Sequence, residues 1–159
     1  MGGALPVSAP EDVHLHLMGA NPVPMALSAA RTVPVAGPAA LADALDQSWL
    51  VPAVHPLSME VASSTGLSRL VLEGNTISAV ASALRMAAAA APELSTFAAT
   101  TLDAVLADGT LAGTGARRDD GSFVRRSCCL LHRLPGAGLC GDCILASPDR
   151  PEAHGGGVV

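Results

Sequence analysis

The sequence RRSCCLLHRLPGAGLCGDCIL, residues 125–145, contains all four cysteines of the 159-residue chain. Cys128 and Cys129 are adjacent, and Cys140 and Cys143 follow as a C-x-x-C pair, so that the full pattern is C-C-x10-C-x2-C. Thiols gathered in one short segment indicate one shared site. The sequence therefore predicts a cysteine-rich C-terminal loop built around that site.

We consider three kinds of site for the four cysteines. A disulfide framework is typical of small secreted domains, and the N-terminal MGGALPVSAPEDV lacks the cationic start and apolar region of a secretory leader. Structural zinc suits the Cys140–Cys143 half, but a zinc site usually has a spacer in its second pair as well, and Cys128 and Cys129 have none. A [2Fe-2S] cluster distributes four thiolates over two irons, so it tolerates pairs that approach from different directions.

The loop between the two cysteine pairs fits a cluster. Pro135, Gly136, Ala137 and Gly138 carry little side-chain bulk, so their backbone N–H groups can approach sulfur closely. Gly141 gives the C-x-x-C turn similar freedom. Adjacent side chains of a strand point to opposite faces, so Cys128 and Cys129 can share a centre only where the backbone turns.

The segment resembles the C-terminal region of the ferric siderophore reductases of the FhuF type. The vicinal cysteines, Arg-Leu-Pro, the glycine-rich loop and Cys-Gly-Asp-Cys occur in the family's order, and weaker similarity extends to LEGNTISAVASAL (72–84) and LAGTG (111–115). Leu131 and His132 stand where members often carry an aromatic residue, and this chain looks shorter at its N-terminus than typical members.

The resemblance implies a [2Fe-2S] cluster held by Cys128, Cys129, Cys140 and Cys143, and one-electron reduction of ferric siderophore iron with release of Fe(II). Its partners would be the siderophore and an electron donor that the sequence does not identify, since we find no convincing flavin or nicotinamide motif. Two other functions stay open: a ferredoxin-like electron carrier with no siderophore site, and a zinc-stabilised interaction module. No catalytic side chain is predicted beyond the cluster.

Arg125, Arg126 and Arg133 flank the cysteines, and two interpretations of them stay open. They form a solvated basic loop, or they offset the charge of a cluster that carries about two negative charges when oxidised, by formal counting. In the second case they, with Gly136, Gly138 and Gly141, make up the cluster environment or a partner contact. His132 is interpreted as a surface residue.

Composition limits the other functions. All nine basic residues are arginine and the formal net charge is −5, so the chain lacks the basic field that drives nucleic-acid binding. The most apolar run, residues 77–92, contains Arg85 and ends at a proline, which falls short of a membrane span. We expect a cytoplasmic protein, either free or peripheral to the inner face of the cell membrane.

The remaining pattern predicts one mainly helical α+β domain over residues 1–150. Residues 1–35 should form a small β element, with Val13, Leu15 and Leu17 alternating with histidines, GANP (19–22) as a turn, and a return strand over 23–27. Residues 38–108 should be helical: a first helix from Pro38 interrupted at Pro52 and Pro56, a short helix ending at Gly66, a long one over 68–90 with a kink or close contact at Gly74, and one from Pro92 to Asp108. Residues 109–145 are predicted as loop and cluster-binding segment, and 151–159 as a disordered tail.

Overall fold

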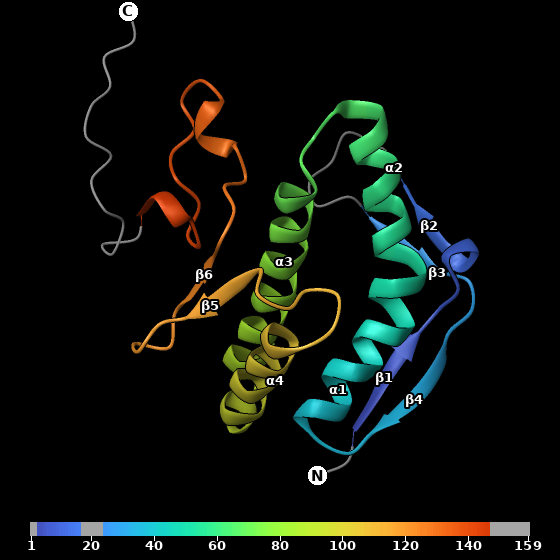
Figure 1. The fold of residues 1–159 in the computed structure, drawn as a ribbon. Helices are drawn as coiled ribbons and strands as arrows, with labels where there is room; N and C mark the ends of the chain where they lie inside the picture. Colours follow the sequence, from blue (N-terminus) through green and yellow to red (C-terminus); the bar gives the residue numbers. More distant parts are fainter. Residues whose placement is uncertain (1–2, 17–23, 147–159) are drawn as a thin grey trace, which may run out of the picture.

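The computed structural model describes residues 3–16 and 24–146, and the predicted turn at 19–22 and the predicted tail at 151–159 lie outside these ranges. Helices form the middle of the molecule (Figure 1). The N-terminal strands lie on one side of them, and the cysteine segment lies on the other side, next to α3 (Arg69–Ala90). The predicted class, mainly helical with small sheets and a C-terminal cysteine segment, is confirmed.

The predicted N-terminal β element consists of two antiparallel pairs. β1 (Gly3–Val7) pairs with β4 (Arg31–Val35), and β2 (Val13–Leu15) pairs with β3 (Met25–Leu27). The indole Nε1 of Trp49 donates a hydrogen bond to the carbonyl oxygen of Pro6 at 3.1 Å. This bond joins the first pair to the helical layer.

The chain stays helical from Pro38 to Thr65, so the predicted interruption at Pro52 and Pro56 is wrong. α1 (Pro38–Leu45) continues into a wider, π-helical stretch, Asp46–Val54, and then into α2 (His55–Thr65). The N–H of His55 reaches back five residues to Leu50 O, so the wider turn continues past the missing N–H of Pro52. Pro56 lies in the first turn of α2, directly after the π-helical stretch.

The predicted ends of the other helices are confirmed. α2 ends at Gly66, which adopts the left-handed φ of 71° that a C-terminal glycine supplies without strain. α3 begins after Ser68, whose hydroxyl accepts the N–H of Leu70. A short turn at Pro92–Leu94 leads into α4 (Ser95–Ala107). Within the described residues, no helix has both the length and the apolar character that crossing a membrane requires.

The core lies between α1, the π-helical stretch, α3 and α4, and aliphatic side chains build it. Ala42 and Ala81 let the helices approach closely, and aliphatic side chains lose less rotamer entropy on burial than long flexible ones do. The loop after α4 adds one buried leucine to the cluster. Its buried members are Ala42, Leu50, Ile77, Ala81, Leu102, Val105 and Leu111.

Part of the predicted loop over 109–145 folds into a β hairpin. β5 (Gly115–Arg117) pairs antiparallel with β6 (Phe123–Arg125). The turn between them closes through the N–H of Gly121, which donates to Arg118 O at 2.9 Å, and Gly121 has the left-handed φ of 81° that the turn requires. Because β6 ends at Arg125, the hairpin sets the direction in which the chain enters the cysteine segment.

The contact predicted at Gly74 is where the cysteine segment meets α3. Gly74 is buried, and a β-carbon built on it would overlap Ser127 Oγ and lie 3.3 Å from Ser127 Cβ. The Ser127 hydroxyl is itself buried and finds no hydrogen-bond partner among the residues that the structure describes. Glycine at position 74 therefore lets the chain pass against the helix directly before the first cysteine.

We expect Gly74→Ala to destabilise the protein by about 1 kcal/mol. Overpacking costs about 1–3 kcal/mol, and the higher helix propensity of alanine returns about 1 kcal/mol. Urea unfolding of Gly74→Ala, Ser127→Ala and the double variant measures this. The Gly74→Ala change should cost much less in the Ser127→Ala background, where the overlapping hydroxyl is absent. An equal loss in both backgrounds would show that the contact with Ser127 does not require glycine.

Candidate metal centre

The cysteine segment runs from the end of β6 along the outer side of α3 (Figure 1). The chain turns directly after the vicinal pair, because Leu130 adopts a left-handed φ of 66°. A second turn follows at Gly136, with φ 75°. The C-x-x-C is a third turn, closed by the N–H of Cys143 donating to Cys140 O at 3.1 Å. The backbone thus supplies the turn that a vicinal pair needs in order to face the second pair.

Two thiols from different halves of the pattern meet. The sulfurs of Cys129 and Cys140 lie 3.5 Å apart. Cys128 Sγ lies instead 3.3 Å from Nδ1 of His132, and Cys143 is buried. All four cysteines are free thiols. Within the described residues, no three Cys, His, Asp or Glu side chains gather as closely as a single-ion site requires.

Each of the four sulfurs lies within reach of an N–H donor. Backbone N–H groups point at three of them: Leu130 at Cys128, 3.3 Å, Leu131 at Cys129, 3.4 Å, and Leu145 at Cys143, 3.4 Å. The fourth, Cys140, accepts from Nη2 of Arg125 at 2.8 Å. Hydrogen bonds of this kind stabilise negative charge on sulfur and tune the potential of iron–sulfur clusters. These donors are placed where they would stabilise thiolates at the four positions.

Arg125 is buried, with 3 % of its surface exposed, and is not part of a solvated loop. Its Nη1 donates to Asn75 Oδ1 on α3 at 2.6 Å, and its Nη2 lies 3.6 Å from an Asp142 carboxylate oxygen. Asp142 also accepts a hydrogen bond from Ser78 of α3. Arg125 and Asp142 together fasten the C-x-x-C turn to the helix.

Arg125 and Asp142 stabilise each other's ionised form. Burial lowers the pKa of Arg125, but the Cys140 contact and the charge of Asp142 outweigh it and raise the pKa overall. Burial likewise opposes ionisation of Asp142, but the bond from Ser78 and the charge of Arg125 lower its pKa overall. A buried cation is thus fixed 2.8 Å from one sulfur, with its countercharge alongside.

The two neighbouring thiols ionise unequally. Burial opposes ionisation of Cys129, but the N–H of Leu131, the Cys140 contact and the charge of Arg125 lower its pKa. Burial, together with the contact to Cys129, raises the pKa of Cys140 to about 11 against the pull of Arg125. Cys129 therefore loses its proton first, and a metal that binds both sulfurs must displace the proton of Cys140.

The other predicted site residues lie on the surface of the segment. Arg126 and Arg133 are exposed, unlike Arg125, and His132 is exposed beside Cys128. Gly136 makes the turn described above. Space is open around Gly138 and Gly141, since a β-carbon on either would meet nothing within 4 Å.

Three residues of the network were not predicted from the sequence: Asn75, Ser78 and Asp142. From the sequence, Asn75 stands out only as part of the stretch 72–84, and Asp142 only as part of the Cys-Gly-Asp-Cys motif. A glycine followed by a polar residue in the middle of an apolar helix was the available signal, since it marks a place where another segment approaches closely.

The donors suit a soft metal group. Thiolates select zinc and iron–sulfur clusters among biological metal groups, and the N–H contact to every sulfur with a buried cation beside one of them fits a group of net negative charge. By donor type, the residues present fit a [2Fe-2S] cluster.

Comparison of the whole chain with curated proteins and with solved structures finds no match. One family model matches, over residues 125–143, and it is described as the FhuF 2Fe-2S C-terminal domain. The matched residues begin at Arg125 and end at Cys143, and they include all four cysteines. The cysteine segment is therefore similar to the FhuF 2Fe-2S C-terminal domain.

Proposed function

We propose that this chain reduces the iron of a ferric siderophore by one electron, so that Fe(II) is released for use in the cell. Cys128, Cys129, Cys140 and Cys143 would hold a [2Fe-2S] cluster. The observation that carries the proposal is the N–H donor at each of the four sulfurs, in a segment that matches the FhuF model.

When bound, the cluster supplies a centre that accepts and donates one electron. The chain's own residues set the conditions for this. The cation of Arg125 would stabilise the additional negative charge of the reduced state, and so raise the reduction potential. Exposed Arg126 and Arg133 place further positive charge on the surface of the segment, where an acidic electron donor can be steered.

The substrate chemistry is consistent with a single electron. Siderophore oxygens are hard ligands that prefer Fe(III), so reduction weakens the complex and Fe(II) dissociates. The electron comes from a separate reductant, protein or small molecule. We place the reaction in the cytoplasm, because unpaired thiols are typical of a reducing compartment.

Purified protein should be red-brown and contain iron and sulfide. After reduction with dithionite and removal of the excess, ferric hydroxamate complexes should reoxidise it, and Fe(II) should appear when a ferrous chelator is present. Rates should saturate with complex concentration, because a binding site implies a complex before electron transfer. They should also differ between complexes of similar potential and different shape.

Three outcomes would contradict parts of this proposal. Colourless protein with one zinc ion per chain would favour the interaction module. Rates that rise linearly and follow driving force alone would identify an electron carrier. Cys140→Ser protein carried through the same reduction serves as the control, and an equal yield of Fe(II) from it would place the reduction outside the cysteine segment.

A further inference from the structure

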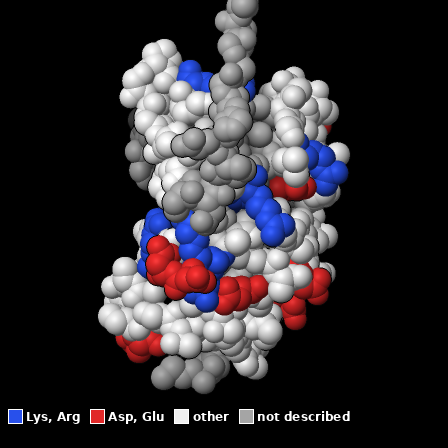
Figure 2. All heavy atoms as spheres, turned by 60° about the vertical axis from the view of Figure 1, so that its left-hand side comes forward, with Lys and Arg blue, Asp and Glu red and all other residues white. Residues whose placement is uncertain are grey.

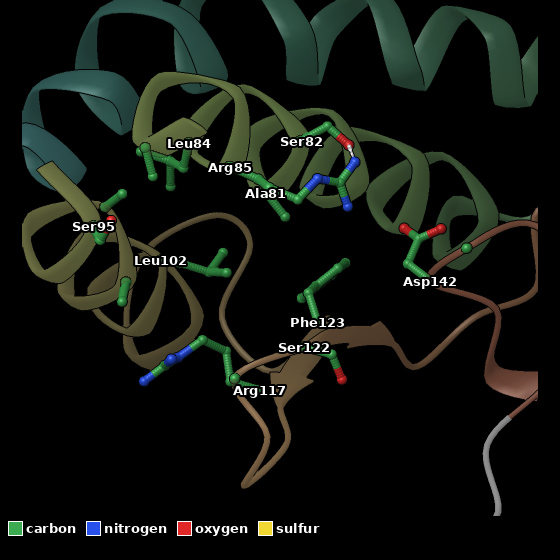
Figure 3. A pocket seen from close by; sticks show the side chains of 15 residues that line it. Ala81, Ser82, Leu84, Arg85, Ser95, Leu102, Arg117, Ser122, Phe123 and Asp142 are labelled. Atoms are coloured by element: carbon green, nitrogen blue, oxygen red, sulfur yellow. Dashed lines mark hydrogen bonds between the residues drawn. The ribbon is translucent and has the colours of Figure 1, made fainter. Parts of the chain in front are cut away.

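A pocket of about 460 Å³ lies directly beside the C-x-x-C turn. Its walls come from α3, α4, the β5–β6 hairpin and the turn itself, through Gly141 and Asp142 (Figure 3). The volume is within the range of pockets that bind small molecules, about 300–1,000 Å³. The pocket is therefore formed where the cysteine segment meets the helical layer.

The floor of the pocket is apolar and its edge is polar. Ala81, Leu102 and Phe123 face the hollow in Figure 3, and serine hydroxyls line it from α3 and the hairpin. Aliphatic surface with a few hydrogen-bonding groups suits a ligand with apolar linkers and acceptor oxygens. Ferric siderophores have this composition.

The two arginines of the pocket differ. Arg117 binds Asp103 with two hydrogen bonds, at 2.7 and 2.9 Å, so its charge is engaged. Arg85 is exposed, and its contact to the Ser82 hydroxyl is long, 3.5 Å. Arg85 is thus the guanidinium that a ligand oxygen can recruit at little cost.

The surrounding face carries both signs of charge. Figure 2, which brings the side of the cysteine segment forward, shows arginines and acidic residues next to one another across the middle of that face. The carboxylate of Asp142 in the pocket is already bound by Ser78 and lies near Arg125. Recognition in the pocket would therefore rest on apolar contact and one guanidinium rather than on a strong field.

The pocket lies beside the residues that separate two of the proposed cluster ligands. Gly141 and Asp142 separate Cys140 from Cys143, and the space around Gly141 is open. A ligand in the pocket can contact the backbone between two proposed cluster ligands. We propose that the ferric siderophore binds here, its apolar parts on the floor and one of its oxygens accepting from Arg85, an inference that rests on the proposed function.

Gallium(III) complexes test binding without electron transfer, because gallium(III) is not reduced under these conditions. We would titrate the cluster-loaded protein with the gallium complexes of a linear trihydroxamate and of a tricatecholate, using calorimetry. Ala99→Leu fills the pocket from α4, and Arg85→Gln removes its available cation. Ala87→Leu, on an exposed position of α3, and Arg31→Gln, in β4, are the matched controls.

The complex that binds wild-type protein more tightly should bind both pocket variants at least about tenfold more weakly, which corresponds to about 1.4 kcal/mol. The visible spectrum and thermal midpoint of these variants should be unchanged, and both controls should bind like wild type. Because Arg85 is exposed, Arg85→Gln tests the pocket even where Ala99→Leu perturbs folding.

Reduction of the ferric complexes by the same preparations separates the two proposals. If Arg85→Gln and folded Ala99→Leu bind the gallium complex as tightly as wild type and still show saturable reduction, the pocket is not the binding site. The proposed reductase activity would then be unaffected. Saturable reduction without gallium binding by wild type also overturns the pocket assignment. Wild-type protein that neither binds nor reduces overturns the proposed function, and the pocket assignment with it.

Discussion

Cys140→Ser is expected to remove nearly all iron and visible absorption from the purified protein. A hydroxyl is a poor substitute for a thiolate on iron, and the change also removes the sulfur that Arg125 and Cys129 contact. Cys128→Ser, Cys129→Ser and Cys143→Ser should likewise lower the iron content and the visible absorption. Iron and sulfide per chain, with the absorption spectrum recorded anaerobically, measure the effect.

Leu139→Ser is the matched control, because it places the same side chain one residue earlier, at an exposed position of the same loop. It should keep the wild-type iron content and spectrum. Leu131→Ser serves the same purpose near Cys128. Loss of iron in these controls as large as in the cysteine variants would mean that serine disturbs the loop whether or not it replaces a thiol.

Cys128 allows a sharper test, since His132 Nδ1 lies 3.3 Å from its sulfur. If all four cysteines are ligands, Cys128→Ser loses the cluster and His132→Ala keeps it. Full iron content in Cys128→Ser, lost only in Cys128→Ser/His132→Ala, would instead assign the fourth position to the histidine. An imidazole ligand raises the potential of such clusters, so the midpoint would identify that case independently.

The helices were largely predictable because their ends are signalled locally. Ser68, Gly66 and Pro92 each act within one turn of their own position, so sequence neighbours are sufficient to place them. The predicted interruption at Pro52 was wrong because it, too, relied on a local signal. The missing N–H of Pro52 is accommodated by a π-helical turn in which His55 bonds to Leu50, and no local rule distinguishes that solution from a break in the helix.

The hairpin β5–β6 was missed because its strands are short. Three residues on each side show no alternation long enough to separate a strand from a loop. Its turn sequence, DDGS (119–122), is typical of a turn, and the structure shows that Gly121 closes it. The pairing also depends on contact with α4, which lies earlier in the chain.

The candidate site also has a part that the sequence could identify and a part that it could not. The cysteines and the glycine-rich loop lie within one short segment, so their pattern could be recognised without knowledge of the fold. The partners of Arg125 and Asp142 could not, because Asn75 and Ser78 lie 50 and 64 residues before the residues they contact. The packing of β6 and of the C-x-x-C turn against α3 brings them together.

Arg125→Gln is expected to destabilise the protein by about 3–5 kcal/mol, the usual cost of removing one partner of a buried ion pair. Asp142 would lose its countercharge, and Asn75 and Cys140 would each lose a donor. The double variant Arg126→Gln/Arg133→Gln changes exposed residues of the same type and should stay within about 0.5 kcal/mol of wild type. The shift of the urea midpoint under anaerobic conditions measures both.

The reduction potential distinguishes an electrostatic role of Arg125 from a purely structural one. Removing the cation from Cys140 disfavours the more negative reduced cluster, so the midpoint should fall by tens of millivolts, since about 59 mV corresponds to about 1.4 kcal/mol for one electron. The exposed pair should give a smaller fall that disappears in high salt, because ions screen exposed charges. Arg125→Lys retains the charge but lacks the planar fork that reaches Asn75 and Cys140 together, so it should recover most of the potential and only part of the stability. If Arg125→Lys and Arg125→Gln had the same midpoint, the charge of Arg125 would have no part in setting the potential, and its role would be limited to holding the C-x-x-C turn on α3.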